Sequence, residues 1–326
     1  MSPATRTSHM PRPAVLVLAA LVALVVIGAL AIALTRPGAP LPLVAPAAPA
    51  AQQRVVQVPS DRSARGSVAY QGGPVQLHPT SYLIFWGPSW QDDFGALNAV
   101  GQDVENYFAD MGGTPYENIL TQYCDAQRRC VANTHELDGV WIDTSRPKPD
   151  PGCIGAHTIS DTNIQREIQR AIQQAGWPTD SENAVYFLYI EKGYDVGAGG
   201  VYQGMLPGLC APNSLYEFCG YHDYSNLAHV AYAVFPYPTD PKGCAKITSD
   251  RDTVSQVLIK VSAHEQFEAI SDPRPQTNTA FNSDNGGEVG DKCNTQFPPQ
   301  ETVLHGNPYN LQLEYSNADR ACVNQR

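Results

Sequence analysis

The sharpest chemical signal in the sequence is the segment His264-Glu-Gln-Phe-Glu268. His264 and Glu268 are one helical turn apart, so in a helix their side chains would point to the same place. Imidazole nitrogens and carboxylate oxygens are both common zinc ligands. Glu265 is offset by about 100° around the helix axis, so it could reach a water at the metal without being a ligand. This is the logic of HExxH metallopeptidases, in which the glutamate is the general base.

The segment departs from that motif at its last position, where Glu268 replaces the second histidine. A carboxylate brings additional negative charge to a metal and should make it a weaker Lewis acid. The pattern therefore predicts metal binding more directly than it predicts catalysis.

A third ligand is expected from the glycine-rich stretch 285–293, which contains Glu288 and Asp291. Glu288 follows Glu268 by 20 residues, a separation similar to that between the second and third ligands of thermolysin-like enzymes. The flanking glycines permit a tight turn that aims a carboxylate back at the helix. We rank Glu288 above Asp291, and His222, close to Cys219, is a further candidate.

Two alternatives apply to the neighbouring acidic residues. Asp272 lies one turn further along the helix, where an end cap or an outer contact is a better interpretation than a ligand. The oxygens of Asp284, Asn285, Glu288 and Asp291 could instead bind a structural calcium ion, although no EF-hand spacing is present.

A helix over about 251–270 must position the motif. Its apolar stripe comprises Val254, Val257, Leu258 and Val261, and Ser249 with Asp252 is the predicted capping box. Continuing this stripe by helical steps leads to His264, Glu265 and Glu268. Ionisable groups on a core-facing stripe are unfavourable unless something pairs with them, and a metal ion would do so.

The remaining pattern predicts an α+β fold, in which helices pack on a mixed twisted sheet as in zincins. The expected strands are 81–86, 118–123, 139–142, 184–190 and 228–237, and the expected further helices are 92–108 and 161–175. Ser160 or Asp161 is the expected cap of the latter helix. The part after Pro273 shows little regular pattern and should be loop-rich and closed by disulfides.

An apolar run of 21 residues, Ala14–Leu34, is long enough to cross a bilayer as a helix. It predicts a cytoplasmic tail at 1–13, a single-pass anchor at 14–34, a Pro/Ala-rich linker at 35–65 and an extracellular globular domain at 66–326. The small residues at 45–51 keep a cleaved signal peptide open as the alternative. The protein is therefore expected at the outer face of the cell membrane or secreted.

Eight cysteines, all after the apolar run, favour up to four disulfides in an oxidising compartment. Short loops favour Cys124–Cys130 and Cys210–Cys219, and Cys293–Cys322 would hold the tail. The net charge is −11 and the basic residues are scattered, so nucleic acid is excluded as a partner.

Several segments together resemble the phosphate-induced (EXORDIUM-like) family of secreted proteins. They are Tyr70–Val75 with Tyr82–Gly87, Thr114–Tyr123, Ile159–Gln165 with Ala184–Phe187, Phe218–His222, and the helix from His264 to Asp272-Pro273. The likeness covers about residues 68–295. Its bacterial members look like carriers of an HExxE helix followed by a turn that Gly287–Cys293 matches here, and its plant members are linked to cell-wall and growth functions. The resemblance implies an extracellular protein without implying a particular reaction.

Two functions follow. The favoured one is an exported zinc-dependent hydrolase, a metallopeptidase acting on peptide, protein or cell-wall substrates and attached to the membrane by its N-terminal helix. Its metal ligands would be His264, Glu268 and either Glu288 or Asp291, with Glu265 as the general base. The alternative is a non-catalytic module that binds cell wall or protein, with a structural metal or none.

Overall fold

The computed structural model describes residues 57–58, 66–151, 153, 157–179, 182–197, 219–238, 252–283 and 287–326. The predicted anchor at 14–34, most of the linker, and Cys210 lie outside these ranges. Within them, no helix has both the length and the apolar character of a membrane span. Strand β1 (Gln57–Val58) lies in the predicted linker and pairs with a strand near the C-terminus.

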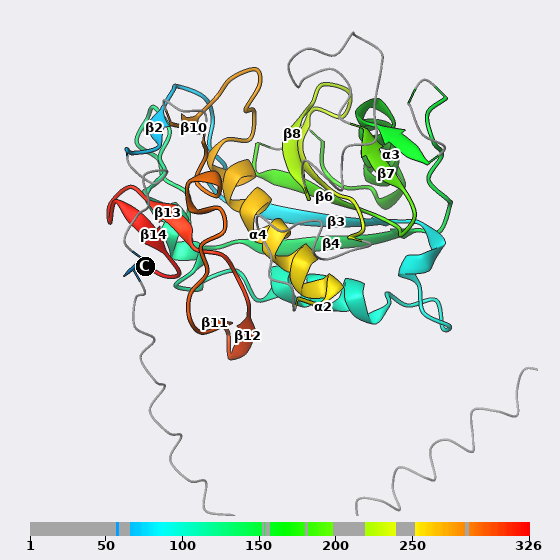
Figure 1. The fold of residues 1–326 in the computed structure, drawn as a ribbon. Coiled ribbons are helices and arrows are strands. Elements are labelled where there is room, and N and C mark those ends of the chain that lie inside the picture. The colour runs from blue at the N-terminus through cyan, green and yellow to red at the C-terminus, as the bar shows by residue number, and fades with distance from the viewer. Residues whose placement is uncertain are drawn as a thin grey trace, which may run out of the picture. The chain divides into compact units, whose positions relative to one another are not determined.

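A five-stranded sheet forms the centre of the globular part (Figure 1). Its order is β4 (Glu136–Asp143), β3 (Thr80–Trp86), β6 (Ala184–Ile190), β9 (Val230–Phe235) and β8 (Tyr221–Ser225). The first four strands are parallel, and β8 is antiparallel to β9 at one edge. This confirms the mixed sheet and the strands expected near 81–86, 139–142, 184–190 and 228–237.

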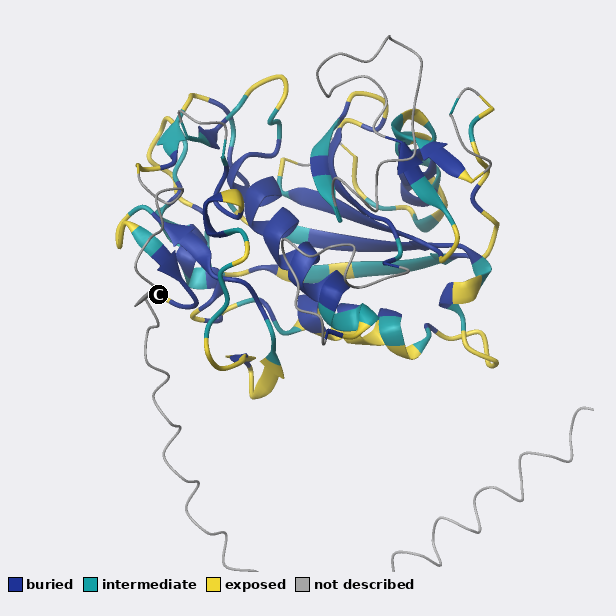
Figure 2. Ribbon diagram, in the orientation of Figure 1, coloured by how far each residue is buried: buried dark blue, intermediate teal, exposed yellow. Residues whose placement is uncertain are grey.

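Both faces of the sheet are covered by helices (Figure 2). Phe85, Phe187 and Phe235 pack on the face covered by α2 (Ala99–Ala109) and α4 (Val254–Ser271). Their neighbours, such as Ile84 and Leu188, pack on the opposite face against α3 (Asp161–Ala175). Because successive strand residues face opposite sides, both sets must be apolar, which explains the continuous apolar runs in β3, β6 and β9.

Helix α4 lies within the core, and its residues 257–271 are all buried. The predicted capping box of Ser249 and Asp252 is wrong. The structure uses the next such pair, in which the Thr253 hydroxyl accepts from Gln256 N and the Gln256 side chain accepts from Thr253 N. The Asp252 carboxylate instead binds Lys260 Nζ at 2.6 Å.

Helix α3 confirms the expected cap, because the Ser160 hydroxyl accepts from Asn163 N. Helix α2 begins seven residues later than predicted, at Ala99 rather than residue 92. The Asp92 carboxylate accepts from the amides of Phe94 and Ala96 and forms a turn, and Asn98 then caps the helix. Phe94, which lies within the predicted helix, is 95% exposed.

The predicted strand at 118–123 is wrong, because the segment forms the 3-10 helix η3 (Glu117–Gln122). The Thr114 hydroxyl accepts from Glu117 N and starts the turn. A short apolar run such as this one fits a buried helical turn as well as a strand, and periodicity alone does not separate them.

Short elements complete the described part. They are η2 (Pro88–Trp90), the parallel pair β5 (Thr158–Ser160) and β7 (Asp195–Gly197), and the antiparallel pair β2 (Ala69–Tyr70) and β10 (Phe281–Asn282). The C-terminal part contains η5 (Asp291–Cys293), the hairpin β11 (Thr302–Leu304) and β12 (Asn307–Tyr309), and β13 (Glu314–Ser316) and β14 (Ala321–Val323) beside β1. Disulfides Cys124–Cys130 and Cys293–Cys322 are present as predicted, and Cys153 and Cys219 are also disulfide-bonded.

His135 gives the fold a testable pH dependence. It is buried with its Nε2 2.7 Å from Ser81 Oγ, and burial lowers its pKa to about 3. Between about pH 6.5 and pH 3 the unfolded chain binds the extra proton, so the free energy of unfolding should fall as the pH falls, by up to ~1.4 kcal/mol per pH unit. His135→Gln retains a hydrogen-bonding amide without titrating, so urea unfolding at pH 7 and pH 4.5 should show a smaller loss. Equal losses in the two proteins would contradict this account of His135.

Candidate metal centre

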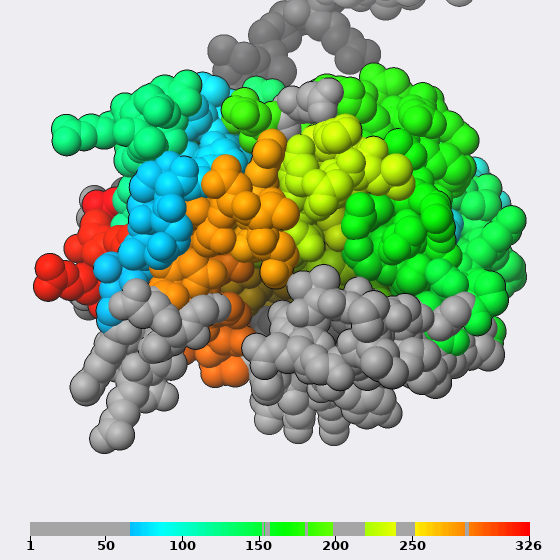
Figure 3. All heavy atoms as spheres, turned by 90° about the horizontal axis from the view of Figure 1, so that it is seen from above, coloured from blue at the N-terminus to red at the C-terminus, as the bar shows by residue number. Residues whose placement is uncertain are grey.

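Three separate elements bring ionisable side chains to the C-terminal half of α4. The helix supplies His264, Glu265 and Glu268. The turn before η5 supplies Glu288, η5 begins with Asp291, and strand β8 supplies His222. Strand β8 and α4 are in contact, and Figure 3 shows the yellow-green β8 region beside the orange segment at the end of α4.

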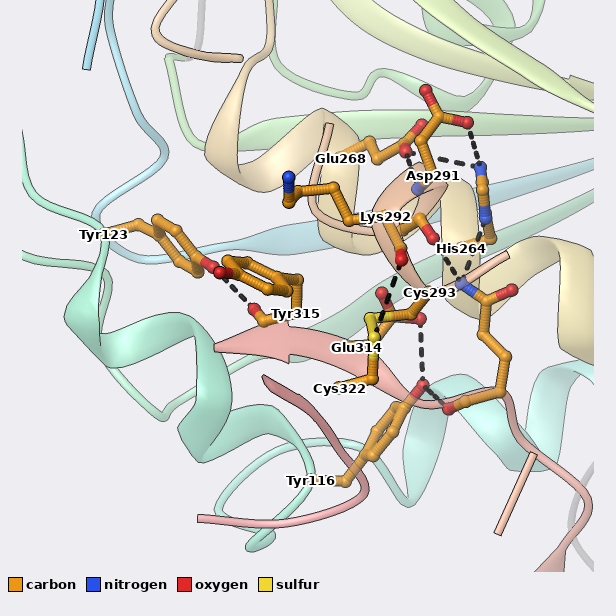
Figure 4. Close-up of a disulfide and its surroundings, with 12 residues drawn as sticks. Tyr116, Tyr123, His264, Glu268, Asp291, Lys292, Cys293, Glu314, Tyr315 and Cys322 are labelled. Atoms are coloured by element: carbon orange, nitrogen blue, oxygen red, sulfur yellow. Dashed lines mark hydrogen bonds and ion pairs between the residues drawn. A yellow bond between two sulfur atoms is a disulfide. The ribbon is translucent and has the colours of Figure 1, made fainter. Parts of the chain in front are cut away.

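The predicted pair His264 and Glu268 converges within the helix. His264 Nε2 lies 3.3 Å from Glu268 Oε1, and both side chains are at least nine-tenths buried. Asp291 approaches the same imidazole, with its Oδ1 3.7 Å from His264 Nε2 (Figure 4). The Asp291 backbone amide also donates to Glu268 Oε1 at 2.9 Å, so this turn is fixed against the helix.

His222 enters the centre from the edge strand. Its Nδ1 lies 3.2 Å from Glu265 Oε2 and 3.6 Å from Glu268 Oε2, while its Nε2 lies 3.6 Å from Glu288 Oε1. Its side chain is 4% exposed. The sequence offered His222 as a candidate only through its nearby cysteine, because its separation of 43 positions from Glu265 conceals their contact.

The two candidates for the third ligand therefore face different histidines. Asp291 faces His264, whereas Glu288 faces His222. Glu268 is central to both, with one oxygen toward each imidazole. Asp272 is the C-terminal cap residue of α4, and its Oδ1 accepts from Ala280 N.

The pKa values of several site residues are shifted because histidines and carboxylates are packed closely together. Burial lowers the pKa of His222, but Glu288, Glu265 and Glu268 outweigh this and raise it to about 10. The pKa of His264 is likewise raised against the effect of burial, mainly by Glu268. Burial raises the pKa of Glu268, but both histidines reverse the effect and lower it.

The pKa values of Asp291 and Glu288, in contrast to that of Glu268, are raised. The negative charge of Glu268, and then burial, raise the pKa of Asp291 to about 6. Burial raises the pKa of Glu288 well above its ordinary value. More carboxyl groups are therefore gathered here than the two imidazoles can pair with.

Two further residues near His264 were not predicted from the sequence. The Gln312 side-chain amide lies 3.0 Å from His264 Nδ1 and donates to Gly290 O at 3.2 Å. Glu314 on β13 is fully buried nearby and accepts from Tyr116 Oη at 3.2 Å (Figure 4). No motif marks Gln312 or Glu314, because their position depends on how the C-terminal strands pack.

The donor set fits a divalent transition metal. His264, Glu265 and Glu268 form one group, and His222, Glu268 and Glu288 form another, in which one donor atom per residue lies within 4.8 Å of the others. Tetrahedral zinc ligands at about 2.0–2.1 Å from the metal lie about 3.3–3.4 Å apart, close to the separations here. Two imidazoles disfavour calcium at this point, since calcium takes oxygen ligands. Asp284 and Asn285, the other residues of the calcium alternative, lie outside the described residues.

Gly290 permits the close approach of the turn to the helix. A Cβ at this position would lie 2.8 Å from His264 Nδ1 and 3.0 Å from Glu268 Oε1, although the backbone φ of −74° itself would allow alanine. Gly290→Ala should therefore displace these candidate ligands and lower the affinity for added zinc by about 10–100-fold, as the loss of residues that support metal ligands does. Competition with a chelator of known affinity measures this. Gly287→Ala is the matched control, because its Cβ would meet no atom closer than 3.5 Å, and equal losses in both variants would contradict the argument.

The Cys293–Cys322 disulfide ties η5, and with it Asp291, to β14 (Figure 4). It spans 29 residues, whereas Cys124–Cys130 spans 6. Loop-closure entropy predicts that replacing the longer-loop pair with alanine lowers the free energy of unfolding by about 3.5 kcal/mol, against about 2 kcal/mol for the shorter. Urea titrations of the two double variants measure the difference, and the reverse order would refute the prediction.

Neither a protein-family model nor a curated protein matches this sequence.

Proposed function

We propose that this chain is an exported zinc-dependent hydrolase whose substrates are peptides, proteins or the peptides of a cell wall. The observation that supports this best is the convergence of buried imidazole and carboxylate donors at the end of α4, 3.3–3.7 Å apart. His264, Glu268 and Asp291 are the proposed ligands. Buried atoms without a hydrogen-bond partner, His222 Nε2 and Glu288 Oε1 among the described residues, support a role for a cation here.

The architecture supports the same proposal. A mixed sheet with an antiparallel edge strand, and a buried helix that presents an HExxE segment beside that strand, are what a zincin-like enzyme needs. The EXORDIUM-like resemblance and the apolar run at 14–34 support export, as do the disulfides.

Each residue has a role in the proposed reaction. A bound divalent cation would polarise the substrate carbonyl and acidify water. Glu265 would accept a proton from the attacking water on a carboxylate oxygen and then deliver it to the leaving amine. His222 Nδ1, 3.2 Å from Glu265 Oε2, would hold that carboxylate in position. Gln312 would orient the His264 ring through Nδ1; for Nε2 to bind a cation the proton must lie on Nδ1, so the Gln312 amide oxygen would face that nitrogen.

The proposal is tested with the purified, oxidised full-length chain. It should cleave casein or a mixed peptide library, lose this activity with 1,10-phenanthroline and regain it when zinc is restored. Activity that survives complete zinc removal would contradict the proposal. A zinc-free chain without activity that binds cell-wall material would support the alternative, a binding module.

A further inference from the structure

Two groups of potential ligands meet at a single side chain. Glu268 belongs both to the group with His264 and Glu265 and to the group with His222 and Glu288. Its Oε1 lies 3.3 Å from His264 Nε2, and one of its oxygens also lies within 4.8 Å of a donor atom of His222 and of Glu288. A carboxylate that belongs to two different ligand sets is placed to bridge two cations.

The group around His222 is a built site. The His222 side chain is 4% exposed, and its Nε2 has no hydrogen-bond partner in the described part of the chain. Glu288 Oε1, 3.6 Å away, is likewise buried without one. Leaving two such atoms unpaired is unfavourable.

The other ring nitrogen of His222 is already engaged. Its Nδ1 lies 3.2 Å from Glu265 Oε2, so with the proton on Nδ1 this bond leaves the Nε2 lone pair on the side of Glu288. Metal-binding histidines typically donate their second ring N–H to a carboxylate in this way. The Asp272 Oδ2 atom is a third buried polar atom for which the described residues provide no hydrogen-bond partner, and its carboxyl interacts with Glu288.

The number of carboxylates also favours two cations. Glu265, Glu268, Glu288 and Asp291 supply four carboxylates around the two imidazoles. One divalent cation would neutralise two of them, whereas two cations would neutralise all four. Buried carboxylates without compensation are strongly unfavourable.

We propose that this centre binds two divalent transition-metal cations bridged by Glu268. The first lies at His264 and Asp291, and the second lies between His222 and Glu288. This inference rests on the proposed function and deepens it, because paired cations can stabilise both the attacking and the leaving group of a hydrolysis.

The test is the zinc stoichiometry of the oxidised full-length chain, measured by elemental analysis after equilibrium dialysis. The expected values are two zinc ions per chain for the wild type, one for His222→Ala, one for Glu288→Gln and one for His264→Ala. His78→Ala, which changes an exposed loop histidine, is the control and should retain two.

The outcomes distinguish a failure of the two-cation centre from a failure of the proposed function. One zinc in the wild type, or two in His222→Ala, overturns the two-cation centre and leaves the proposed function standing. No zinc in the wild type overturns both. A second measurement needs no variant, because two Mn²⁺ ions sharing a carboxylate give an exchange-coupled EPR spectrum, whereas a six-line spectrum from isolated ions would overturn the proposal.

Discussion

Replacing Glu265 with glutamine is expected to lower the rate of peptide hydrolysis by about 10²–10⁴-fold, which is the usual contribution of a general base. Glutamine has the shape of glutamate but cannot accept the proton from water. The amide can still lie against His222, which is 3.2 Å from the present carboxylate. Folding and zinc content should therefore change little, and kcat should fall more than KM rises.

The matched control for this prediction is Glu301→Gln, the same substitution at an exposed position. It should leave both rate and zinc content unchanged. Retention of more than about a tenth of the wild-type rate in Glu265→Gln would exclude Glu265 as the general base.

Replacing Glu268 with glutamine is expected to remove most of the stabilisation that added zinc should give the wild-type protein. Zinc present at 100 times its Kd should raise the free energy of unfolding by about 2.7 kcal/mol. In a domain of this size that corresponds to a Tm increase of about 5–10 °C, reversed by a chelator. Glu268 belongs to both ligand groups, so an amide in its place should remove most of this shift.

Packing should survive this change, because a glutamine Oε1 can still accept from the Asp291 amide that Glu268 now binds at 2.9 Å. Glu265→Gln is the matched control, one turn away on the same helix, and should retain the zinc-dependent shift. The shift should also shrink toward pH 5 even in the wild type, because the histidines must lose their protons to bind a metal. A full zinc-dependent shift in Glu268→Gln would show that the ion binds elsewhere.

The sequence predicted the parts of the fold in which local pattern and burial agree. Strands β3 and β6 are buried on both faces, so their apolar runs are unambiguous, and α3 carries both its cap and its stop signal in the sequence. The predicted start of α2 was wrong because the Asp92 carboxylate forms a turn where the helix was expected. The segment of η3 was predicted as a strand, but the Thr114 hydroxyl initiates a helical turn there. These are interactions of single hydroxyl and carboxylate groups, which periodicity does not detect.

The residues of the metal centre likewise include some that local pattern could place and others that it could not. The His264–Glu268 pair follows from helical geometry alone and lies as predicted. The pairing of Asp291 with His264 and of Glu288 with His222 depends on the direction of one turn and on the edge strand β8. Both are set by tertiary packing, so the sequence could nominate these residues without assigning their partners.

We infer that the residues at the end of α4 hold a metal. Elemental analysis of the purified, oxidised full-length chain tests it most directly. We predict at least one tightly bound zinc ion per chain, retained through dialysis against buffer and absent from Glu268→Gln. A folded wild-type chain that contains no metal and takes up none from added zinc would contradict the account.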